Sequence, residues 1–448
     1  MAAKKKKSRD VSACSALRKH FGRLPLENLI TASRTFPVTA RVDLQAALEK
    51  IFGAGYAGQL LGVHSLYSHE TLTFADLTRA GTHPVLVGPL QHDEIDVGEA
   101  MPARCLKRGV WLSKSQDLRF GVLATPATRF GQDDGMHIEI AVPPGEPGLK
   151  LSQSFLAEVE RLISQTASYR GKVISLEGGR SYSGKASSVK VHKLRSVKRE
   201  EVVLPEKTIG LLERNVRDFI QQRERLRGLG MALKKGLLFY GPPGTGKTHT
   251  IQYLASQLPD HTTLLITSEQ VGLLDEYFLL ARFLQPAMVV IEGVDLIARA
   301  REDMRNPCEE SLLNKLLNEM DGLREDAAIL FVLTTNRPEQ LEAALASRPG
   351  RVDQAIEFPL PDEDGRRKLV QLYARGLKVP DAIADLIVRK TKKASAAFIK
   401  KLLRRCAQFF LQSGSQSGLE IGHVEAALDE MLFAGGSLNV KLLGGGTE

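Results

Sequence analysis

Apolar and polar positions switch between strand and helix periods in the second half of the chain. Apolar runs of strand length lie at residues 237–240, 287–291 and 329–333, and segments with helical spacing separate them. Buried strands that alternate with helices are typical of a parallel sheet covered by helices on both faces. The pattern therefore predicts an α/β domain over residues 205–361, which opens with a helical segment.

Beyond residue 361 the apolar positions keep only a helical period. Helices are predicted over residues 364–373, 382–389, 395–411 and 421–431. They predict a small helical bundle over residues 362–432. A flexible tail is expected over residues 433–448.

The first half predicts a separate domain that mixes helices and strands. Residues 43–52 have helical spacing, and residues 155–166 predict an amphipathic helix. Short strands are predicted at residues 85–87 and 137–142. These elements indicate an α+β domain over residues 21–177, whose sequence carries no chemistry that can be named.

Two segments lack a strong periodic pattern. Residues 1–20 begin with a basic run that no apolar segment follows, so we predict a disordered terminus and no secretory signal. Residues 178–204 open with glycine and serine and predict a linker. Within it, residues 189–197 alternate apolar and basic side chains. A half-buried strand is favoured over a nucleic-acid-binding strip, because no aromatic residues are interleaved.

Composition narrows the class of protein. Hydrophobic residues make up 43% and charged residues 25% of the chain, as in soluble globular proteins. No apolar run reaches the roughly 18 residues that a membrane-spanning helix needs. The 4 cysteines are widely spaced, which indicates neither a disulfide framework nor a zinc site and favours a reducing, cytoplasmic location. The net charge of +9 leaves nucleic-acid binding as an alternative without further support.

A phosphate-binding motif lies between the first apolar strand and the next helix. Residues 241–248 read Gly-Pro-Pro-Gly-Thr-Gly-Lys-Thr, a complete GxxxxGK[ST] pattern. The glycines let backbone N–H groups curl around phosphate oxygens, and the following helix directs its positive end at the anion. We expect Lys247 to reach the β- and γ-phosphates and Thr248 to ligate Mg²⁺. The predicted nucleotide-binding residues are Gly241, Pro242, Pro243, Gly244, Thr245, Gly246, Lys247, Thr248 and His249.

Two further strand ends supply candidate catalytic groups. Glu292 follows the apolar residues 287–291 and suits a carboxylate that holds Mg²⁺ together with Thr248. Asn336 ends the next apolar strand, where its amide can orient an attacking water molecule. A strand-terminal turn at Asn336 is the alternative interpretation.

These residues resemble the motifs of the AAA family of ATPases. The resemblance covers residues 205–432, and its motifs lie at residues 241–248, 312–323, 334–337, 347–353 and 358–362. It implies a P-loop NTPase sheet with a C-terminal helical lid, bound ATP and Mg²⁺, and a homo-oligomeric ring, usually a hexamer. By its place in the motif, Arg351 is implied to be an arginine finger that reaches the γ-phosphate held by the neighbouring subunit.

Two positions depart from the family pattern. Gln354 stands where a second finger arginine often lies. The usual Asp-Glu pair after the strand is replaced by Glu292 followed by Gly293. A bacterial branch and the distantly similar Bcs-type translocases also place Glu first, but with an acid after it. Gly293 cannot polarise water, so slow hydrolysis is predicted unless Glu292 or Asp295 takes that role.

Three functions are compatible with these motifs. We favour an ATPase that remodels or disassembles a protein partner and uses the N-terminal domain as its adaptor. An ATP-gated scaffold with little turnover is the alternative, supported by Gly293 and Gln354. A nucleic-acid-associated ATPase rests on basic residues alone. The loop before Val271 and Gly272 lacks the aromatic residue of protein-threading members, which argues against threading.

Overall fold

The computed structural model describes residues 11–56, 58–65, 70–80, 83–129, 132–166, 168–178, 186–295, 311–322, 324–339, 352–414 and 418–434. The chain divides into two compact units. The first comprises Met1–His192 with Asp275–Leu284, and the second comprises Lys193–Leu274 with Gln285–Glu448. Among the helices of the described ranges, none has both the length and the apolar character needed to cross a membrane.

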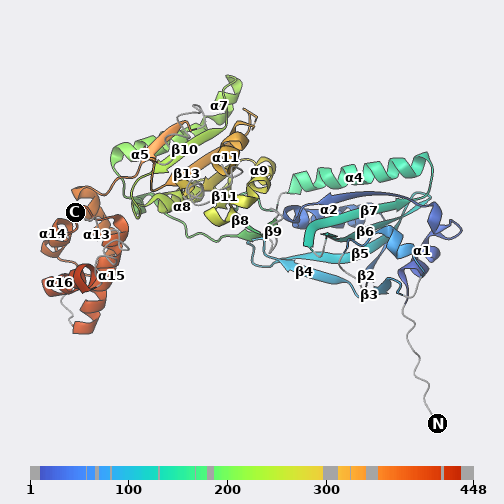
Figure 1. Cartoon of the computed structure of the whole chain (residues 1–448), viewed down its shortest axis with the longest axis horizontal. Helices are drawn as coiled ribbons and strands as arrows, with labels where there is room; N and C mark the ends of the chain where they lie inside the picture. Colours follow the sequence, from blue (N-terminus) through green and yellow to red (C-terminus); the bar gives the residue numbers. More distant parts are fainter. Residues whose placement is uncertain are drawn as a thin grey trace, which may run out of the picture. The chain divides into compact units, whose positions relative to one another are not determined.

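The first unit is built on an antiparallel sheet (Figure 1). Its strands are β1 (Ile30–Phe36), β2 (Gly58–His64), β3 (Leu86–Gly88), β4 (Gln91–Ile95), β5 (Ala103–Ser115), β6 (Leu118–Arg129) and β7 (Gln132–Val142). Their order is β1-β7-β6-β5-β2-β3, and β4 also pairs with β5. Every one of these pairings is antiparallel.

Helices cover both faces of this sheet. They are α1 (Ala13–Phe21), α2 (Arg41–Ala54), α3 (Phe74–Thr78) and α4 (Glu146–Thr166). Val122 packs with α2 and α4, whereas Leu123 packs with α1 and α3. Successive side chains of a strand point to opposite faces, so β6 contributes to both cores. This confirms the predicted mixture of helices and strands in the N-terminal domain.

Helix α1 begins inside the segment that the sequence predicts to be disordered. The Ser12 hydroxyl caps it by accepting a hydrogen bond from the Ser15 N–H at 3.2 Å. Leu17 and Phe21 on this helix are buried in the core formed with α3. The prediction of disorder is therefore wrong for residues 11–20, because a short apolar stripe among basic residues is enough once a sheet covers it. Residues 1–10 lie outside the described residues.

A β-hairpin occupies part of the segment predicted as a linker. Strands β8 (Val173–Gly178) and β9 (Ala186–Val191) pair in antiparallel fashion. Ile174 lies opposite Val191 and Leu176 opposite Val189. The linker prediction is therefore wrong for residues 186–191, because cross-strand pairing outweighs the glycine and serine content of the neighbouring residues. The predicted half-buried strand begins within β9.

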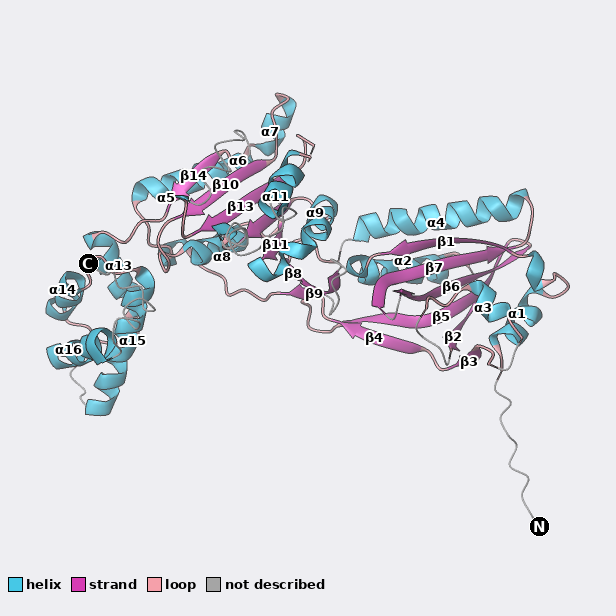
Figure 2. Cartoon of the chain, viewed as in Figure 1, coloured by secondary structure: helices cyan, strands magenta, loops and turns pink. Residues whose placement is uncertain are grey.

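The second unit contains a parallel sheet, as the sequence predicts (Figure 2). Its strands are β10 (Lys235–Tyr240), β11 (Thr262–Ile266), β12 (Ala287–Ile291), β13 (Ile329–Thr335) and β14 (Gln354–Glu357). Neighbouring strands follow the order β14-β10-β13-β12-β11 and are parallel. Every residue of β12 and β13 is buried, as expected for central strands covered on both faces.

Helices precede and alternate with these strands. They are α5 (Glu206–Glu213), α6 (Phe219–Gln221), α7 (Arg223–Gly228), α8 (Lys247–Gln257), α9 (Leu274–Phe283) and α11 (Ser311–Asp321). A π-helical turn (Arg214–Asp218) connects α5 to α6. Tyr277 and Phe278 of α9 are completely buried.

The chain after Pro361 forms the predicted helical bundle. Its helices are α13 (Glu363–Tyr373), α14 (Asp381–Lys390), α15 (Ala396–Ser413) and α16 (Ile421–Asp429). They share one apolar core, centred on side chains such as Ile387, Leu402 and Val424. We call this bundle the lid. Asp362 directly precedes α13 and caps this helix, because its side chain accepts a hydrogen bond from the Gly365 N–H.

Candidate functional site

The loop between β10 and α8 can adopt its shape because its glycines have positive φ angles. The φ values of Gly241, Gly244 and Gly246 are 137°, 76° and 105°, a region that side-chain-bearing residues rarely adopt. A Cβ atom on Gly241 would lie 2.3 Å from the Phe358 carbonyl oxygen. One on Gly244 would lie 2.9 Å from the Ala397 Cβ of the lid. Both the curl of the loop and its contact with the lid therefore require glycine.

Lys247 begins α8 directly after this loop and turns its amine back into it. The Nζ atom donates to the carbonyl oxygens of Gly241 at 2.7 Å and Pro242 at 3.0 Å. The residue is only 9% exposed. Burial lowers the pKa of Lys247 to about 8, although the Asp295 carboxylate opposes this change. The loop thus surrounds a buried amine that an anion can approach from the cavity side.

Thr248 and Glu292 lie together beside the loop. The Thr248 hydroxyl donates to Glu292 Oε1 at 2.8 Å. The backbone of Glu292 is fixed because its N–H donates to the Ile266 carbonyl at 2.9 Å. Hydroxyl and carboxylate oxygens next to a phosphate site are the ligands that Mg²⁺ prefers. The two residues predicted to hold the metal are therefore adjacent and chemically suited to it.

Asp295 joins the ends of β12 and β13 beneath the site. The residue is 4% exposed, and its Oδ1 accepts from the Thr335 hydroxyl at 2.9 Å and the Asn336 N–H at 3.3 Å. Asn336 itself lines the cavity described below. Because Oδ1 already has two donors, Asp295 is better suited to fixing Asn336 than to activating water. The sequence suggested Asp295 only as a substitute for the missing acid.

The position after Glu292 is shaped for glycine. Gly293 has a φ of 69°, and its N–H donates to the Thr334 hydroxyl at 3.1 Å. No side chain is present there to contact water or nucleotide. Arg351, predicted as the arginine finger, lies outside the described residues. Gln354, at the place of the second arginine, lies in β14 and donates to the Ala355 carbonyl at 2.8 Å.

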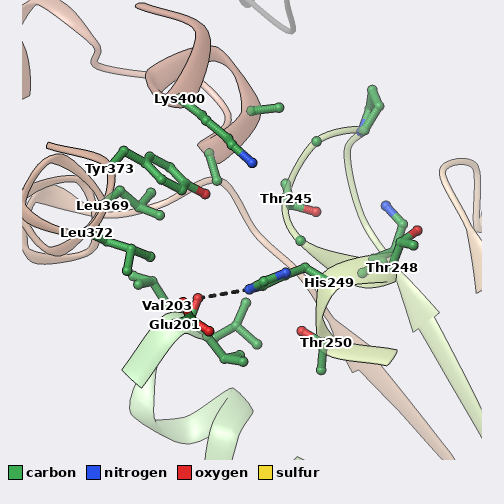
Figure 3. Close-up of a pocket in the computed structure, with 18 of the residues that line it drawn as sticks. Glu201, Val203, Thr245, Thr248, His249, Thr250, Leu369, Leu372, Tyr373 and Lys400 are labelled. Carbon is green, nitrogen blue, oxygen red and sulfur yellow. Dashed lines mark hydrogen bonds between the residues drawn. The ribbon is translucent and has the colours of Figure 1, made fainter. Parts of the chain in front are cut away.

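A cavity of about 620 Å³ lies over the loop and reaches the lid (Figure 3). One end is polar and is lined by residues 243–250 and Asn336. The other end combines four charged residues, Arg195, Glu201, Arg375 and Lys400, with apolar side chains from the lid and from the segment before α5. These are Val202, Val203, Leu204, Leu369, Leu372, Tyr373, Ala396 and Ala397. The volume and the division into two ends suit a nucleotide, with phosphates at the loop and the base at the apolar end.

The apolar end contains the site residues that the sequence did not reveal. Val203 and Leu369 belong to residue types that fill any core, and only the folded chain brings them to one cavity. His249, which was predicted to bind nucleotide, does line the cavity. Its Nε2–H donates to the Glu201 carbonyl at 3.1 Å, so its ring is turned toward this end (Figure 3).

Comparison with known proteins gives the same picture for the second unit. The sequence profile of the ATPase family associated with various cellular activities (AAA) matches residues 237–360. The proteasome-activating nucleotidase of Methanothermobacter thermautotrophicus is 32% identical over 223 residues, which cover 46% of this chain and 54% of that protein. The proteasome-activating nucleotidase 1 of Halobacterium salinarum is 30% identical over 279 residues, with 60% and 65% covered.

A zinc metalloprotease shows a similar extent of likeness. The ATP-dependent zinc metalloprotease FtsH 2 of Symbiobacterium thermophilum is 32% identical over 232 residues, covering 49% of this chain and 39% of that protein. The chain thus spans less than two thirds of the length of each of these relatives. The crystal structure of the FIGL-1 AAA domain in complex with ADP matches 52% of this chain and 85% of that chain, at 21% identity and a TM-score of 0.44.

Proposed function

Residues 237–360 belong to the AAA family of ATPases and carry its ATP-binding P-loop, and from this premise we propose that the chain binds ATP with Mg²⁺ and hydrolyses it to remodel or disassemble a protein partner. The observation that carries the proposal is the arrangement around the loop. Lys247 is enclosed by the loop, and the Thr248–Glu292 pair lies 2.8 Å apart beside it. The proposed phosphate ligand and metal ligands thus lie together where the start of α8 meets the end of β12.

Each end of the cavity has a proposed role. Lys247 and the N–H groups of the glycine loop bind the β- and γ-phosphates, because an ammonium and backbone donors surround the anion. A Mg²⁺ ion held by Thr248 and Glu292 would neutralise charge on these phosphates. Tyr373 and Val203 enclose the base at the apolar end. Asn336, fixed by Asp295, orients the attacking water.

We further propose that turnover is slow. The position that would supply a water-activating acid is Gly293, and such a group typically contributes about 10² to 10⁴ in rate. Asp295 is engaged with Thr335 and Asn336, and Glu292 is engaged with Thr248. Each carboxylate therefore already holds a neighbouring group through one of its oxygens.

The assembly is a homo-oligomeric ring, a hexamer, in this proposal. Arg351 would complete the site of the neighbouring subunit as an arginine finger, which in related phosphoryl transfers contributes roughly 10³ to 10⁵ in rate. The N-terminal domain, which lies outside residues 237–360 that match the family, would bind the protein substrate or adaptor. The motif around residues 347–353 supports the finger assignment.

Calorimetry and turnover measurements on the whole chain test this function. ATP with Mg²⁺ should release heat on binding, and Lys247→Ala should abolish it. Steady-state phosphate release should be measurable and absent in the same variant. If neither chain binds ATP, the proposal is wrong. Binding without any release, even with partner proteins present, would instead favour the ATP-gated scaffold, which Gly293 supports.

A further inference from the structure

Glu201 lies where three segments of the second unit meet beside the nucleotide cavity. It ends a short 3₁₀ turn (Arg199–Glu201) and is only 9% exposed. Its backbone carbonyl accepts the hydrogen bond from His249 on α8 at 3.1 Å (Figure 3). The 3₁₀ turn is thereby tied to the helix that carries Lys247 and Thr248.

The side chain of Glu201 contacts two cations that line the same cavity. Arg195 Nη2 donates to Glu201 Oε1. Arg375, which follows α13 of the lid, has its Nη1 at 3.7 Å from the same oxygen. The second carboxylate oxygen accepts from the Lys198 N–H at 3.0 Å. This hydrogen bond, followed by the charges of Arg195 and Arg375, lowers the pKa of Glu201 and keeps it ionised.

The residues after Glu201 form one wall of the apolar end of the cavity. Val202, Val203 and Leu204 lie there together with Leu369 and Tyr373 of the lid. When a triphosphate occupies the glycine loop, the base attached to it must lie at this end. The position of the wall therefore decides whether base and phosphates can be bound together.

We propose that Glu201 is a positioning residue for the nucleobase, which fixes the wall of residues 202–204 to both α8 and the lid. The inference rests on the proposed nucleotide binding and adds a residue to that site. Glu201 acts through the wall, since its own carboxylate is already shared among Arg195, Lys198 and Arg375. The base is bound more tightly because wall, loop and lid are held in one arrangement before it enters.

The size of the effect follows from the exposure of the partners. The side chains of Arg195 and Arg375 are 80% and 64% exposed, so each ion pair alone contributes modestly. Both pairs share a carboxylate that is mostly buried, and neutralising it weakens both at once. We expect a loss of base-dependent affinity of about fivefold.

A comparison of two competitors tests the proposal. A fluorescent ADP analogue bound to the whole chain is displaced either by ADP or by inorganic tripolyphosphate, which has no base. The variants are Glu201→Gln, Arg375→Gln and the double variant. Glu200→Gln is the matched control, because Glu200 is the adjacent residue, carries the same charge and is exposed.

Glu201→Gln should weaken ADP binding about fivefold and change tripolyphosphate binding by less than about twofold. Arg375→Gln should act in the same direction. The double variant should be weaker than the native chain by less than the product of the two single effects, because both changes remove the same ion pair. Glu200→Gln should match the native chain for both competitors.

Equal losses for ADP and tripolyphosphate, or no loss for either, would overturn the positioning role. Arg375 is exposed, so Arg375→Gln gives a readable result even where Glu201→Gln is not folded. If the native chain binds neither competitor, the proposed nucleotide binding fails and this inference fails with it. If the native chain binds both and the variants do not separate them, only this inference fails.

Discussion

The Thr248 hydroxyl and the Glu292 carboxylate are joined by a hydrogen bond of 2.8 Å, although 44 positions separate them in the chain. Thr248 is the second residue of α8 and Glu292 follows β12, so the contact exists only because β10 and β12 lie in the same parallel sheet. Parallel sheets bring the carboxyl ends of their strands to one edge, where ligands bind. The pair therefore links the phosphate loop to the proposed metal ligand.

Removal of the Thr248 hydroxyl should selectively reduce the effect of Mg²⁺ on ATP binding. In Thr248→Val, the strengthening of ATP binding by Mg²⁺ should fall by about tenfold, since one ligand and its hydrogen bond are lost. Binding in the presence of a chelator should change little. Titration calorimetry with and without Mg²⁺ measures both quantities. Thr248→Ser keeps the hydroxyl and should resemble the native chain; equal behaviour of Val and Ser variants would contradict the assignment.

Restoring an acid after Glu292 should increase turnover. Gly293→Asp should raise the steady-state rate of ATP hydrolysis at least about tenfold, because a carboxylate can then polarise water. The φ of 69° means that any side chain is strained there, at roughly 1 to 2 kcal/mol of stability. Asn has the same size as Asp and a similar strain in this conformation, so Gly293→Asn should show the strain without the gain in rate. A native rate that is fast and unimproved by Gly293→Asp would refute slow turnover.

ATP affinity should decrease at alkaline pH because of Lys247. The pKa of its amine in the free protein is about 8, and phosphates favour the protonated form. The association constant should therefore vary little below pH 7 and fall above pH 8, approaching tenfold per pH unit. Calorimetric titrations between pH 7 and 9.5 measure this slope. In Lys247→Arg the cation does not titrate in that range, so whatever affinity remains should lack the slope.

Folding stability should decrease at acid pH because of a buried histidine. His261 is 8% exposed and accepts from Arg223 Nη1 at 3.1 Å. Burial, assisted by the Arg223 charge, lowers the pKa of His261 to about 4. The unfolded chain binds a proton near pH 6.5 and the folded chain does not. The stability that this group contributes to the folded chain is therefore fully present above pH 6.5 and is lost as the pH falls toward 4.

Denaturant titrations at several pH values measure this loss. The native chain should lose up to about 3 kcal/mol through this group between pH 7 and pH 4. His261→Gln keeps an acceptor for Arg223 but does not titrate, so its stability should depend less on pH over that range. Parallel pH profiles of the two chains would show that another group is responsible.

The sequence predicted the phosphate end of the site because the residues that bind phosphate lie in one contiguous motif or directly after apolar strands. Lys247 and Thr248 belong to one motif, and Glu292 and Asn336 each follow an apolar run of strand length. The folded chain shows why they lie together: the carboxyl ends of the parallel strands meet at one edge of the sheet. Glycine content also indicated the loop, and the positive φ of Gly244 gives the physical reason.

The apolar end and the small peripheral elements could not be predicted in this way. Val203 and Tyr373 are distant in the chain and belong to no recognisable motif, so only the packing of the lid identifies them as cavity residues. Helix α1 was missed, and the predicted strand began only at residue 189 of β9, because the stability of both elements depends on partners elsewhere. Leu17 needs the sheet beneath it, and Val189 needs Leu176 opposite.

The backbone N–H of Ala397, at the start of α15, donates to the Gly244 carbonyl at 3.1 Å. The lid is therefore attached to the phosphate loop by a hydrogen bond between main-chain atoms. Only a substitution of Ala397 by proline would remove the donor. Any swing of the lid must either stretch this bond or drag the loop along. The orientation of the lid is consequently coupled to the conformation of the phosphate loop, and none of the variants considered above removes this hydrogen bond.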